Sequence, residues 1–508
     1  MASSHRLPSS DHPEQAGGQR LPHVDMLVGG QRTSSANDEW FIVESPATQQ
    51  PLARVPRGGS TDVDRAVACA LDAFPLWRDT NPTDRGSALL RIGDDIAADV
   101  ERLARLLAAE TGNAIRTQSR PEILQAARAF RYFGGASGEL KGETVPLGNQ
   151  LLSYTVRVPF GVVAAVIPWN SPALLGSMKI AMALVTGNTI VLKSAEDAPL
   201  TMLAIAEICS RHLPDGVVNV LTGFGVECGQ PLLAHRQIAK ISFTGSTLVG
   251  KLAMRLASDR LLPLTLELGG KSPTVIFPDR DDDITVQGVL DGVRITRQSQ
   301  SCTAGARLLV HESIFDSFTE RLADRLGSLR IGDPLAEDSD IGSIINRRQY
   351  ERVGEFLADS QAAGAHAMVG GPPSAEERSA PGYFVRPTLL TNVDARWRVA
   401  REEVFGPVLV AIPWATEGEV VQMANDTHYG LAAFVWTNDI GAGLRTAHAI
   451  DAGWVQVNRG GGQILGMSYG GRRESGLGQE FSIEGALDGY TFRKSVTVDI
   501  SAASGDTP

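Results

Sequence analysis

Hydrophobic positions recur with helical spacing in the first third of the chain. This periodicity predicts helices over residues 61–77, 84–110 and 121–135. Thr61 and Thr83 stand where the N-caps of the first two helices are expected, because a threonine hydroxyl can accept a hydrogen bond from the first helical turn.

From Gly161 onwards, short apolar runs alternate with segments of helical length. Repeated β–α units of this kind predict parallel sheets with helices on both faces, so the expected fold class is α/β. The predicted strands lie at 151–158, 162–167, 189–192, 217–221, 238–243, 273–277, 307–310 and 408–412. The helices expected between the earlier strands cover 171–184, 199–212 and a segment from Ser246, and 370–381 is the most loop-like internal segment.

Composition narrows the class of protein. The 508 residues carry a net charge of −11, which argues against a nucleic-acid partner because such proteins need a basic surface. The four cysteines are scattered, and no CxxC pair or HExxH helix is present, so neither a disulfide scaffold nor a metal site is expected. Residues 1–23 have a disordered composition without a signal-peptide core, and no run of about 18 apolar residues occurs. We expect a cytoplasmic protein with no membrane partner and reduced thiols.

Three residues are candidates for chemistry. Cys302 lies among small polar residues just before a strand, although a lone cysteine is more often an inert buried residue. Glu267 sits in an apolar run before a glycine pair, where burial would raise its pKa towards that of a general base; the alternative is a surface glutamate that ends a strand. Asn170 follows a buried strand and could donate a hydrogen bond to an oxyanion, but a turn or cap residue is the commoner role.

A second group of residues has the features of a dinucleotide site. Residues 243–250 follow a strand and open a helix whose N-terminus can bind a phosphate group. Gly225 and Gly229 lie in a glycine-rich turn without the GxGxxG spacing, which makes this signal weak alone. Lys193 and Glu196 follow another strand, so a carboxylate there could bind ribose hydroxyls, although an ordinary exposed pair is the alternative.

Taken in order, these motifs resemble the aldehyde dehydrogenase superfamily from about residue 24 to residue 498. The matching pieces are 168–170, 193–196, 243–246, 267–273, 300–305 and 403–407, followed by Tyr469 with 470–471 and 475–478. Each piece is modestly specific, whereas the ordered set is very specific.

The resemblance implies a hydrolytic, non-acylating enzyme. Cys302 would attack the aldehyde, Asn170 and the Cys302 backbone N–H would hold the oxyanion, and Glu267 would activate water to hydrolyse the thioester. Lys179 would belong to a proton relay, and Glu480 matches a late family glutamate.

The resemblance also implies a cofactor, NAD, with NADP less favoured because Glu196 would repel a 2′-phosphate. Ser246 would lie against the pyrophosphate, and Glu403 would contact the nicotinamide ribose. The residues placed against the dinucleotide are Ile167, Pro168, Trp169, Lys193, Glu196, Gly225, Gly229, Phe243, Gly245, Ser246, Val249, Leu268, Gly269, Glu403 and Phe405.

The family organisation implies three parts. Residues 24–140 and 160–267 would form a Rossmann-like NAD-binding domain, and 268–480 an α/β catalytic domain. Residues 141–159 and 481–508 would supply a small β oligomerisation element, with a strand near 495–500, and the C-terminal tail. The resemblance therefore implies a homodimer or homotetramer.

The substrate is less determined. Ser171 and Met178 stand where small-aldehyde members have aromatic residues, and Leu174, Leu175 and 460–467 offer apolar surface, so we expect a medium or bulky apolar aldehyde. Two alternatives stay open. One is a semialdehyde with a distal carboxylate, for which Arg297 or Arg459 could serve. The other is a CoA-acylating relative, against which the presence of Glu267 argues.

Overall fold

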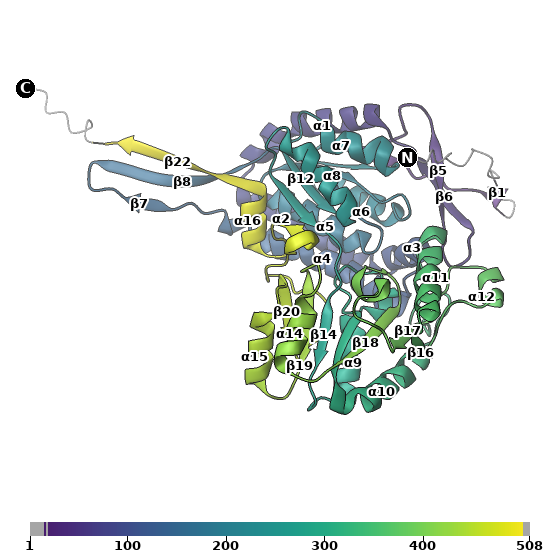
Figure 1. Cartoon of the computed structure of the whole chain (residues 1–508). Coiled ribbons are helices and arrows are strands. Elements are labelled where there is room, and N and C mark those ends of the chain that lie inside the picture. Colours follow the sequence, from purple (N-terminus) through teal and green to yellow (C-terminus); the bar gives the residue numbers. More distant parts are fainter. Residues whose placement is uncertain (1–14, 17–18, 501–508) are drawn as a thin grey trace, which may run out of the picture.

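The chain forms two α/β halves and a projecting β arm, as the computed structural model shows for residues 15–16 and 19–500 (Figure 1). The upper half in this view is built from the first half of the sequence, and the lower half mostly from the second. The predicted α/β class is confirmed.

The first half of the molecule is centred on an eight-stranded sheet. Its five middle neighbours, from β13 to β11, run parallel, and the outer strands pair antiparallel. The buried strands are the apolar runs of the sequence, as expected for a sheet covered on both faces. In spatial order the strands are β21 (Gly476–Leu477), β13 (Leu264–Glu267), β12 (Lys240–Thr244), β9 (Val162–Val166), β10 (Thr189–Lys193), β11 (Val218–Leu221), β3 (Met26–Val28) and β4 (Gln31–Thr33).

Eight helices accompany this sheet. Helix α2 packs on α4, and α4 packs on α5, so their alanine and phenylalanine faces form the largest hydrophobic core. The helices are α1 (Ser60–Asp79), α2 (Pro82–Ala98), α3 (Val100–Thr111), α4 (Arg120–Gly135), α5 (Pro172–Val185), α6 (Leu200–Ser210), α7 (Gln230–Ala234) and α8 (Thr247–Ser258).

The second half of the molecule is centred on a seven-stranded sheet that is parallel except for the edge strand β16. In spatial order its strands are β16 (His366–Val369), β17 (Thr388–Thr391), β18 (Val408–Trp414), β15 (Arg307–His311), β14 (Pro273–Ile276), β19 (Ala432–Trp436) and β20 (Trp454–Val457). The remaining helices are α9 (Asp283–Gly292), α10 (Phe315–Gly327), α11 (Arg347–Ala362), α12 (Ala375–Ser379), α13 (Arg398–Arg401), α14 (Glu417–Asn425), α15 (Ile440–Ala449) and α16 (Ile483–Tyr490).

A three-stranded antiparallel sheet projects from the body (Figure 1). It contains β22 (Thr491–Asp499), β8 (Leu151–Pro159) and β7 (Thr144–Pro146), with β8 in the middle. We call these strands the arm. Two short antiparallel pairs complete the strands: β5 (Trp40–Glu44) with β6 (Pro51–Pro56), and β1 (Gln15–Ala16) with β2 (Gln19–Arg20).

The structure corrects the predicted helix starts. The Asn81 side chain, not Thr83, caps α2 by accepting a hydrogen bond from the Thr83 N–H at 2.9 Å, because Pro82 occupies the first helical position. Helix α1 begins after Gly59, so Thr61 lies inside its first turn. The single helix predicted over 84–110 is two helices, since the backbone leaves the helical conformation at Asp99.

Other predicted boundaries shift. The loop predicted over 370–381 contains the short helix α12, which Ser374 and Glu377 stabilise by a reciprocal capping pair. The C-terminal strand predicted at 495–500 starts earlier, at Thr491. The predicted extension 1–23 lies mostly outside the described residues, but Leu21 is buried and the backbone of His23 forms a parallel β-bridge with Arg54.

No helix in the described part of the chain has both the length and the apolar character needed to cross a bilayer.

Candidate active site

Cys302 lies in a tight loop between α9 and β15. The residues leading into it adopt left-handed backbone conformations, with φ of 52° at Gln298 and 54° at Ser299. The thiol is partly buried, and its Sγ lies 3.7 Å from the Tyr469 hydroxyl. Burial raises the pKa of Cys302 to about 11, although the Tyr469 hydrogen bond opposes this shift. The thiol is therefore protonated at neutral pH and needs help to become a nucleophile.

Asn170 is tied to the cysteine loop. It follows β9, is buried, and its Nδ2 donates a hydrogen bond to the Gln300 backbone oxygen at 2.8 Å. A carboxamide nitrogen carries two hydrogens, so one is left for another acceptor. The backbone N–H of Cys302 donates no hydrogen bond within the described residues. Both donors that sequence analysis assigned to an oxyanion are therefore free to act.

Glu267 ends strand β13, where β21 pairs with it antiparallel through Gly476. Its side chain is 4% exposed, and neither carboxylate oxygen has a hydrogen-bond partner in the described residues. Burial, reinforced by the charge of Glu480, holds the pKa of Glu267 well above the usual range, and Lys179 partly offsets the shift. A Cβ atom on Gly270, three residues after Glu267, would lie 2.5 Å from the Cys302 backbone oxygen, so the Glu267 segment adjoins the Cys302 loop. A buried, unpartnered carboxyl group of this kind can accept a proton from water.

Lys179 lies beneath this site in a fully buried polar network. Its Nζ donates to Glu480 Oε1 at 2.8 Å and to Ser242 Oγ at 2.9 Å. The Tyr490 hydroxyl donates to the same serine at 3.1 Å. Lys179, expected in a proton relay, thus pairs with Glu480, for which the resemblance gave no role. Ser242 and Tyr490 were not predicted from the sequence; the available signal was a serine between the apolar residues Ile241 and Phe243 of β12.

Lys193 and Glu196 form an ion pair at the carboxyl end of β10, with Nζ and Oε2 separated by 2.8 Å. Burial alone would raise the pKa of Glu196, but the charge and hydrogen bond of Lys193 outweigh it, so the pKa falls below the usual value. Glu196 is thus an anion at neutral pH, with 34% of its side chain exposed to solvent.

The helix N-terminus predicted to bind phosphate is present. Ser246 caps α8 by accepting a hydrogen bond from the Val249 N–H at 3.4 Å. A side chain at Gly245 would collide with the Phe243 ring, which lies 2.7 Å from the position of a Cβ atom there. Nearby, Cβ atoms at Gly225 and Gly229 would meet only open space. Open glycines and a free helix N-terminus can accommodate a dinucleotide backbone.

Exposed apolar side chains lie next to these glycines in the sequence. Val226 is 78% exposed, and on α8 Leu248 is 77% and Val249 39% exposed. Such apolar surface is suited to pack against the flat face of the adenine ring of a dinucleotide. The residues present therefore fit a dinucleotide cofactor.

The remaining cofactor candidates lie between the two halves of the molecule. Glu403 Oε1 accepts a hydrogen bond from the Gly270 N–H at 3.0 Å, and a Cβ atom on Gly269 would lie 2.5 Å from Glu403 Oε2. Burial raises the pKa of Glu403 to about 7. The Trp169 and Phe405 rings meet edge to face at 5.3 Å. Residues 403–405 thus meet two segments that are distant in the sequence, one at Gly269 and one at Trp169.

Three other cofactor candidates have apolar side chains that offer no polar contact. Ile167 and Leu268 are buried, and Pro168 is partly buried. Leu268 packs against Gly250 of α8, where a Cβ atom would lie 2.4 Å from its side chain.

The residues expected to line the substrate side are distributed differently from the prediction. Ser171 and Met178 are buried, and Met178 is part of the main hydrophobic core. Leu175 and Leu465 are partly buried and pack against the same core as Cys302. Arg459 is exposed, whereas Arg297 lies 3.9 Å from the Glu122 carboxylate. Arg294 was not predicted from the sequence; its Nε donates to Thr303 Oγ1 at 3.3 Å, one residue beyond Cys302.

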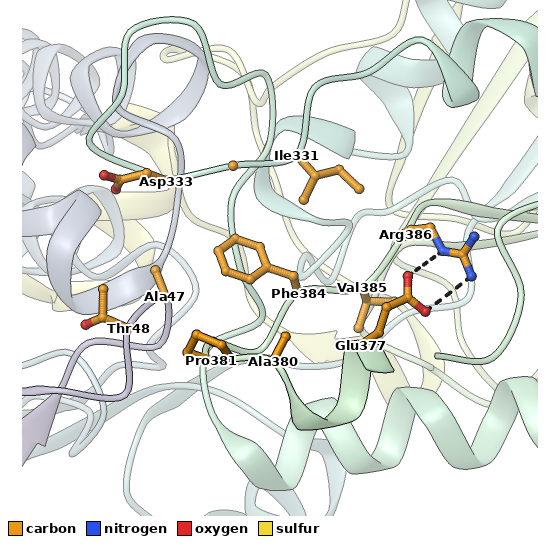
Figure 2. Close-up of a pocket in the computed structure, with 12 residues that line it drawn as sticks. Ala47, Thr48, Ile331, Asp333, Glu377, Ala380, Pro381, Phe384, Val385 and Arg386 are labelled. Carbon is orange, nitrogen blue, oxygen red and sulfur yellow. Dashed lines mark hydrogen bonds and ion pairs between the residues drawn. The ribbon is translucent and has the colours of Figure 1, made fainter. Parts of the chain in front are cut away.

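A cavity of about 510 Å³ lies elsewhere, and Figure 2 shows the residues that line it. Phe384 projects into its centre, and Arg386 pairs with Glu377 at 2.8 Å on one side. None of the predicted site residues lines this cavity, and its charged pair is already satisfied. It therefore does not compete with the Cys302 region as a candidate active site. Within the described residues, no group of three histidine, cysteine or acidic side chains could hold a metal ion.

Comparison with known proteins gives a consistent result. The model of the aldehyde dehydrogenase family matches residues 32–496. An aldehyde dehydrogenase of Aspergillus niger is 37% identical over 476 residues, which cover 93% of this chain and 94% of that protein. A hydroxyisobutyraldehyde dehydrogenase of Mycolicibacterium austroafricanum is 36% identical over 476 residues, or 94% of each protein.

Solved structures agree with the sequence matches. The NAD⁺ complex of the Bacillus cereus aldehyde dehydrogenase has a TM-score of 0.91 and 35% identity, and covers 94% of this chain and 97% of its own. An NADP-dependent enzyme of E. coli has a TM-score of 0.91 and 33% identity, and covers 94% of this chain and 98% of its own. The expected aldehyde dehydrogenase fold is confirmed.

Proposed function

The chain belongs to the aldehyde dehydrogenase family, and from this premise we propose that it oxidises an aldehyde to the carboxylic acid with NAD. The observation that carries the proposal is the buried Glu267 carboxyl group, which has no hydrogen-bond partner within the described residues and stands on the segment that adjoins the Cys302 loop. A nucleophile and an unengaged base in one enclosed region suit two-step covalent catalysis.

In the first step, the Cys302 sulfur forms a bond to the aldehyde carbon, and its proton passes to a base. The oxyanion of the resulting thiohemiacetal accepts hydrogen bonds from the second Asn170 amide hydrogen and from the Cys302 N–H. Such fixed donors stabilise charge that develops in the transition state. The 2.8 Å hydrogen bond from Asn170 to the Gln300 carbonyl fixes the position of the amide relative to the cysteine loop.

In the second step, the thiohemiacetal carbon loses a hydride and becomes a thioester. A bound nicotinamide dinucleotide supplies the hydride acceptor. Glu267 then removes a proton from water, which attacks the thioester, releases the acid and returns the thiol. The charges of Glu480 and Lys179, which are joined by a 2.8 Å contact, act on Glu267 in opposite directions and so set how readily it holds this proton. The presence of this base favours hydrolysis over transfer to CoA.

An assay of NAD reduction with a panel of aldehydes tests this proposal. NADH should appear only when an aldehyde is present, and mass spectrometry should identify the free acid in equal amount. An acyl-CoA product formed faster in the presence of CoA would favour the acylating alternative. No NADH formation with any aldehyde would refute the proposed oxidation.

The preference for NAD over NADP is proposed from Glu196. Its ionised carboxylate would repel a 2′-phosphate on the adenosine ribose. Glu196→Ser is therefore expected to raise the NADP/NAD ratio of kcat/KM about 10-fold, as removal of a like charge near a protein surface would give. Steady-state kinetics with both cofactors measures this ratio.

Glu207 offers a matched control for that variant. It is also 34% exposed and is also paired at 2.8 Å, with Arg32 of the edge strand β4. Glu207→Ser should leave the cofactor ratio unchanged. An equal rise in both variants would mean that total charge, not the position of Glu196, sets the preference.

For the substrate we propose an aldehyde with a carbon chain of medium length or bulk. Leu175, Leu465 and Tyr132 are partly buried against the same core as Cys302 and offer apolar contact to such a chain. Each methylene buried there adds about 0.8 kcal/mol, which is roughly fourfold in affinity. The kcat/KM should therefore increase from acetaldehyde to octanal.

We propose that the arm joins copies of this chain into a homodimer or homotetramer. Its outer strand β22 is nine residues long and is paired on one side only within the described residues. Exposed apolar side chains lie on all three strands, including Val145 at 44%, Leu152 at 46% and Phe492 at 46%. A long exposed edge with apolar side chains requires a partner.

Sedimentation measures this assembly directly. A mass of two or four times 54.1 kDa is expected at micromolar concentration. A monomer under these conditions would contradict the proposal.

Within each copy, we propose that residues 24–140 with 160–267 bind the cofactor and that 268–480 carry the nucleophile.

A further inference from the structure

The hydroxyl of Tyr469 lies against the sulfur of Cys302, with the oxygen 3.7 Å from Sγ. Tyr469 stands in the segment between β20 and β21, 167 positions after the cysteine. The family resemblance includes this tyrosine among the matching pieces but gives its hydroxyl no role. A hydroxyl that touches the reacting atom can take part in the chemistry, and its surroundings determine how.

Neighbouring rings and backbone hydrogen bonds fix the position of Tyr469. Its ring meets the Trp454 ring edge to face at 5.9 Å and the Phe481 ring at 5.2 Å. The Tyr469 N–H donates to the Glu480 oxygen at 3.1 Å, and the Glu480 N–H donates back at 2.7 Å. The side chain is 4% exposed. The hydroxyl is therefore held beside the sulfur before any substrate binds, as effective stabilisation of charge requires.

The direction of the hydrogen bond depends on which of the two groups ionises first. Burial, and then the charges that Cys302 and Glu267 carry when ionised, hold the pKa of Tyr469 well above its usual range. A hydrogen bond with the Gln463 side chain opposes this rise in pKa. Burial raises the pKa of Cys302 to about 11, and the hydrogen bond from Tyr469 is the largest effect that opposes it. The thiol therefore ionises while the phenol keeps its proton.

This order of ionisation favours the thiolate. A thiolate can only accept hydrogen bonds, so the contact is then filled by the O–H of Tyr469. Hydrogen bonds to an ionised acceptor are shorter and about twice as strong as those between neutral groups. The neutral thiol, a weak acceptor, gains less from the same contact. The hydroxyl thus supports the reactive form of Cys302 in a site where burial acts against it.

We propose that Tyr469 is a catalytic residue that donates a hydrogen bond to the Cys302 sulfur whenever this sulfur carries negative charge. The inference rests on the proposed aldehyde oxidation and adds a residue to its mechanism. In the first step the thiol proton passes to the base, the sulfur forms its bond to the aldehyde carbon, and the tyrosine keeps its own proton. In the last step water attacks the thioester, and the carbon–sulfur bond breaks with its electron pair on sulfur. The same hydroxyl stabilises the departing thiolate, and the base returns the thiol proton.

Tyr469→Phe isolates the hydroxyl, because phenylalanine keeps the ring that packs on Trp454 and Phe481. Alkylation of Cys302 by iodoacetamide, followed by mass spectrometry of the peptide that carries it, requires neither aldehyde nor NAD. At pH 8 alkylation should be about 3- to 10-fold slower in the variant. Loss of a hydrogen bond to a charged group changes the ionisation equilibrium about 10- to 100-fold, and the greater nucleophilicity of a less acidic thiol recovers about half of this on a logarithmic scale.

Turnover gives a second readout. The kcat/KM for an aldehyde of medium chain length should fall by a similar factor in Tyr469→Phe, whereas the Kd for NAD should stay at the wild-type value. A tyrosine that serves only to pack the site would lower the melting temperature without slowing the alkylation of Cys302. The alkylation rate therefore separates a chemical role from a structural one.

Tyr383→Phe is the matched control. Tyr383 is 6% exposed, its ring meets Tyr350 at 6.0 Å, and its hydroxyl donates to Glu44 Oε1 at 3.0 Å. It stands between two residues that line the separate cavity of Figure 2, Gly382 and Phe384. This variant also loses a hydrogen-bonded hydroxyl from a buried ring, but it should leave the alkylation of Cys302 and the turnover unchanged.

Three results would overturn the inference. Alkylation of Tyr469→Phe at the wild-type rate would mean that the hydroxyl only fills space. Faster alkylation would mean that the hydroxyl accepts a hydrogen bond from the thiol and keeps it protonated. Equal slowing in Tyr383→Phe would mean that any loss of a buried hydroxyl disturbs the site. A wild-type protein that oxidises no aldehyde would instead refute the proposed function, and with it the catalytic role of Tyr469, even where slower alkylation of Tyr469→Phe demonstrated the hydrogen bond.

Discussion

Cys302→Ala is expected to abolish aldehyde-dependent NADH formation, with a fall in kcat of more than about 10⁴-fold, because removal of a covalent nucleophile leaves only binding and oxyanion stabilisation. Alanine keeps the backbone N–H and removes only the sulfur, which contacts the Tyr469 hydroxyl at 3.7 Å. The assigned cofactor residues lie on other segments, so the affinity for NAD should change less than about threefold, within the usual effect of a remote substitution. Stopped-flow absorbance at 340 nm and fluorescence titration with NAD measure the two quantities.

Cys69→Ala provides the control for this variant. Cys69 is also a partly buried free thiol, but it lies on α1 and packs near Gly29, where a Cβ atom would be 3.1 Å from its sulfur. Its loss should leave turnover at the wild-type level. A comparable loss of activity in Cys69→Ala, or substantial activity left in Cys302→Ala, would show that the nucleophile is misassigned.

The ends of parallel strands could be predicted from the sequence because they follow from short-range patterns. Asn170 comes just after the apolar run of β9, and Glu267 closes that of β13, two strands away in the sheet. Carboxyl ends of parallel strands meet at one edge, which is why Asn170 was predicted at a ligand crevice, whereas β13 was not among the predicted strands. The charge state of Glu267 was predictable in direction, since the run around it is apolar.

Arg294 could not be found in this way. In the sequence it looks like a basic residue just beyond a helix C-terminus, where a solvated cation is favourable. Its orientation depends on a left-handed φ of 59° and on Gly462, 168 positions later. Neither the conformation of a non-glycine residue nor a contact of such range leaves a periodic signal.

The buried network of Lys179 was only half predicted for a similar reason. Its link to Ser242 joins a helix to the interior of a strand, and Tyr490 joins both to the base of the arm. A serine between two apolar residues of a strand signals an unusual contact but does not identify its partner. Long-range polar contacts of this kind are set by tertiary packing. The same holds for the break at Asp99, which divides the helix predicted over 84–110 into α2 and α3.

Glu267→Gln is expected to separate the two chemical steps. Glutamine keeps the volume of the side chain but cannot take a proton from water, so thioester hydrolysis should slow by about 10²- to 10⁴-fold, the usual contribution of a general base. Hydride transfer precedes this step. A burst of about one NADH per active site should therefore precede a slow steady state.

The pH dependence of the slow phase sharpens this test, because its sign follows from the environment of Glu267. Burial holds the pKa of this carboxyl group well above its usual range. Only the ionised form can act as a base, so wild-type hydrolysis of the thioester should accelerate as the pH rises through that raised pKa and then level off. Glu267→Gln should lose this rise. Glu474→Gln is the control, since Glu474 is an exposed carboxylate paired with Lys251 at 2.9 Å and should leave the profile unchanged. Steady-state turnover of Glu267→Gln at the wild-type rate would exclude Glu267 as the base. A variant that releases free acid slowly after the burst, with a flat pH profile, is the result that the unpartnered carboxyl group predicts.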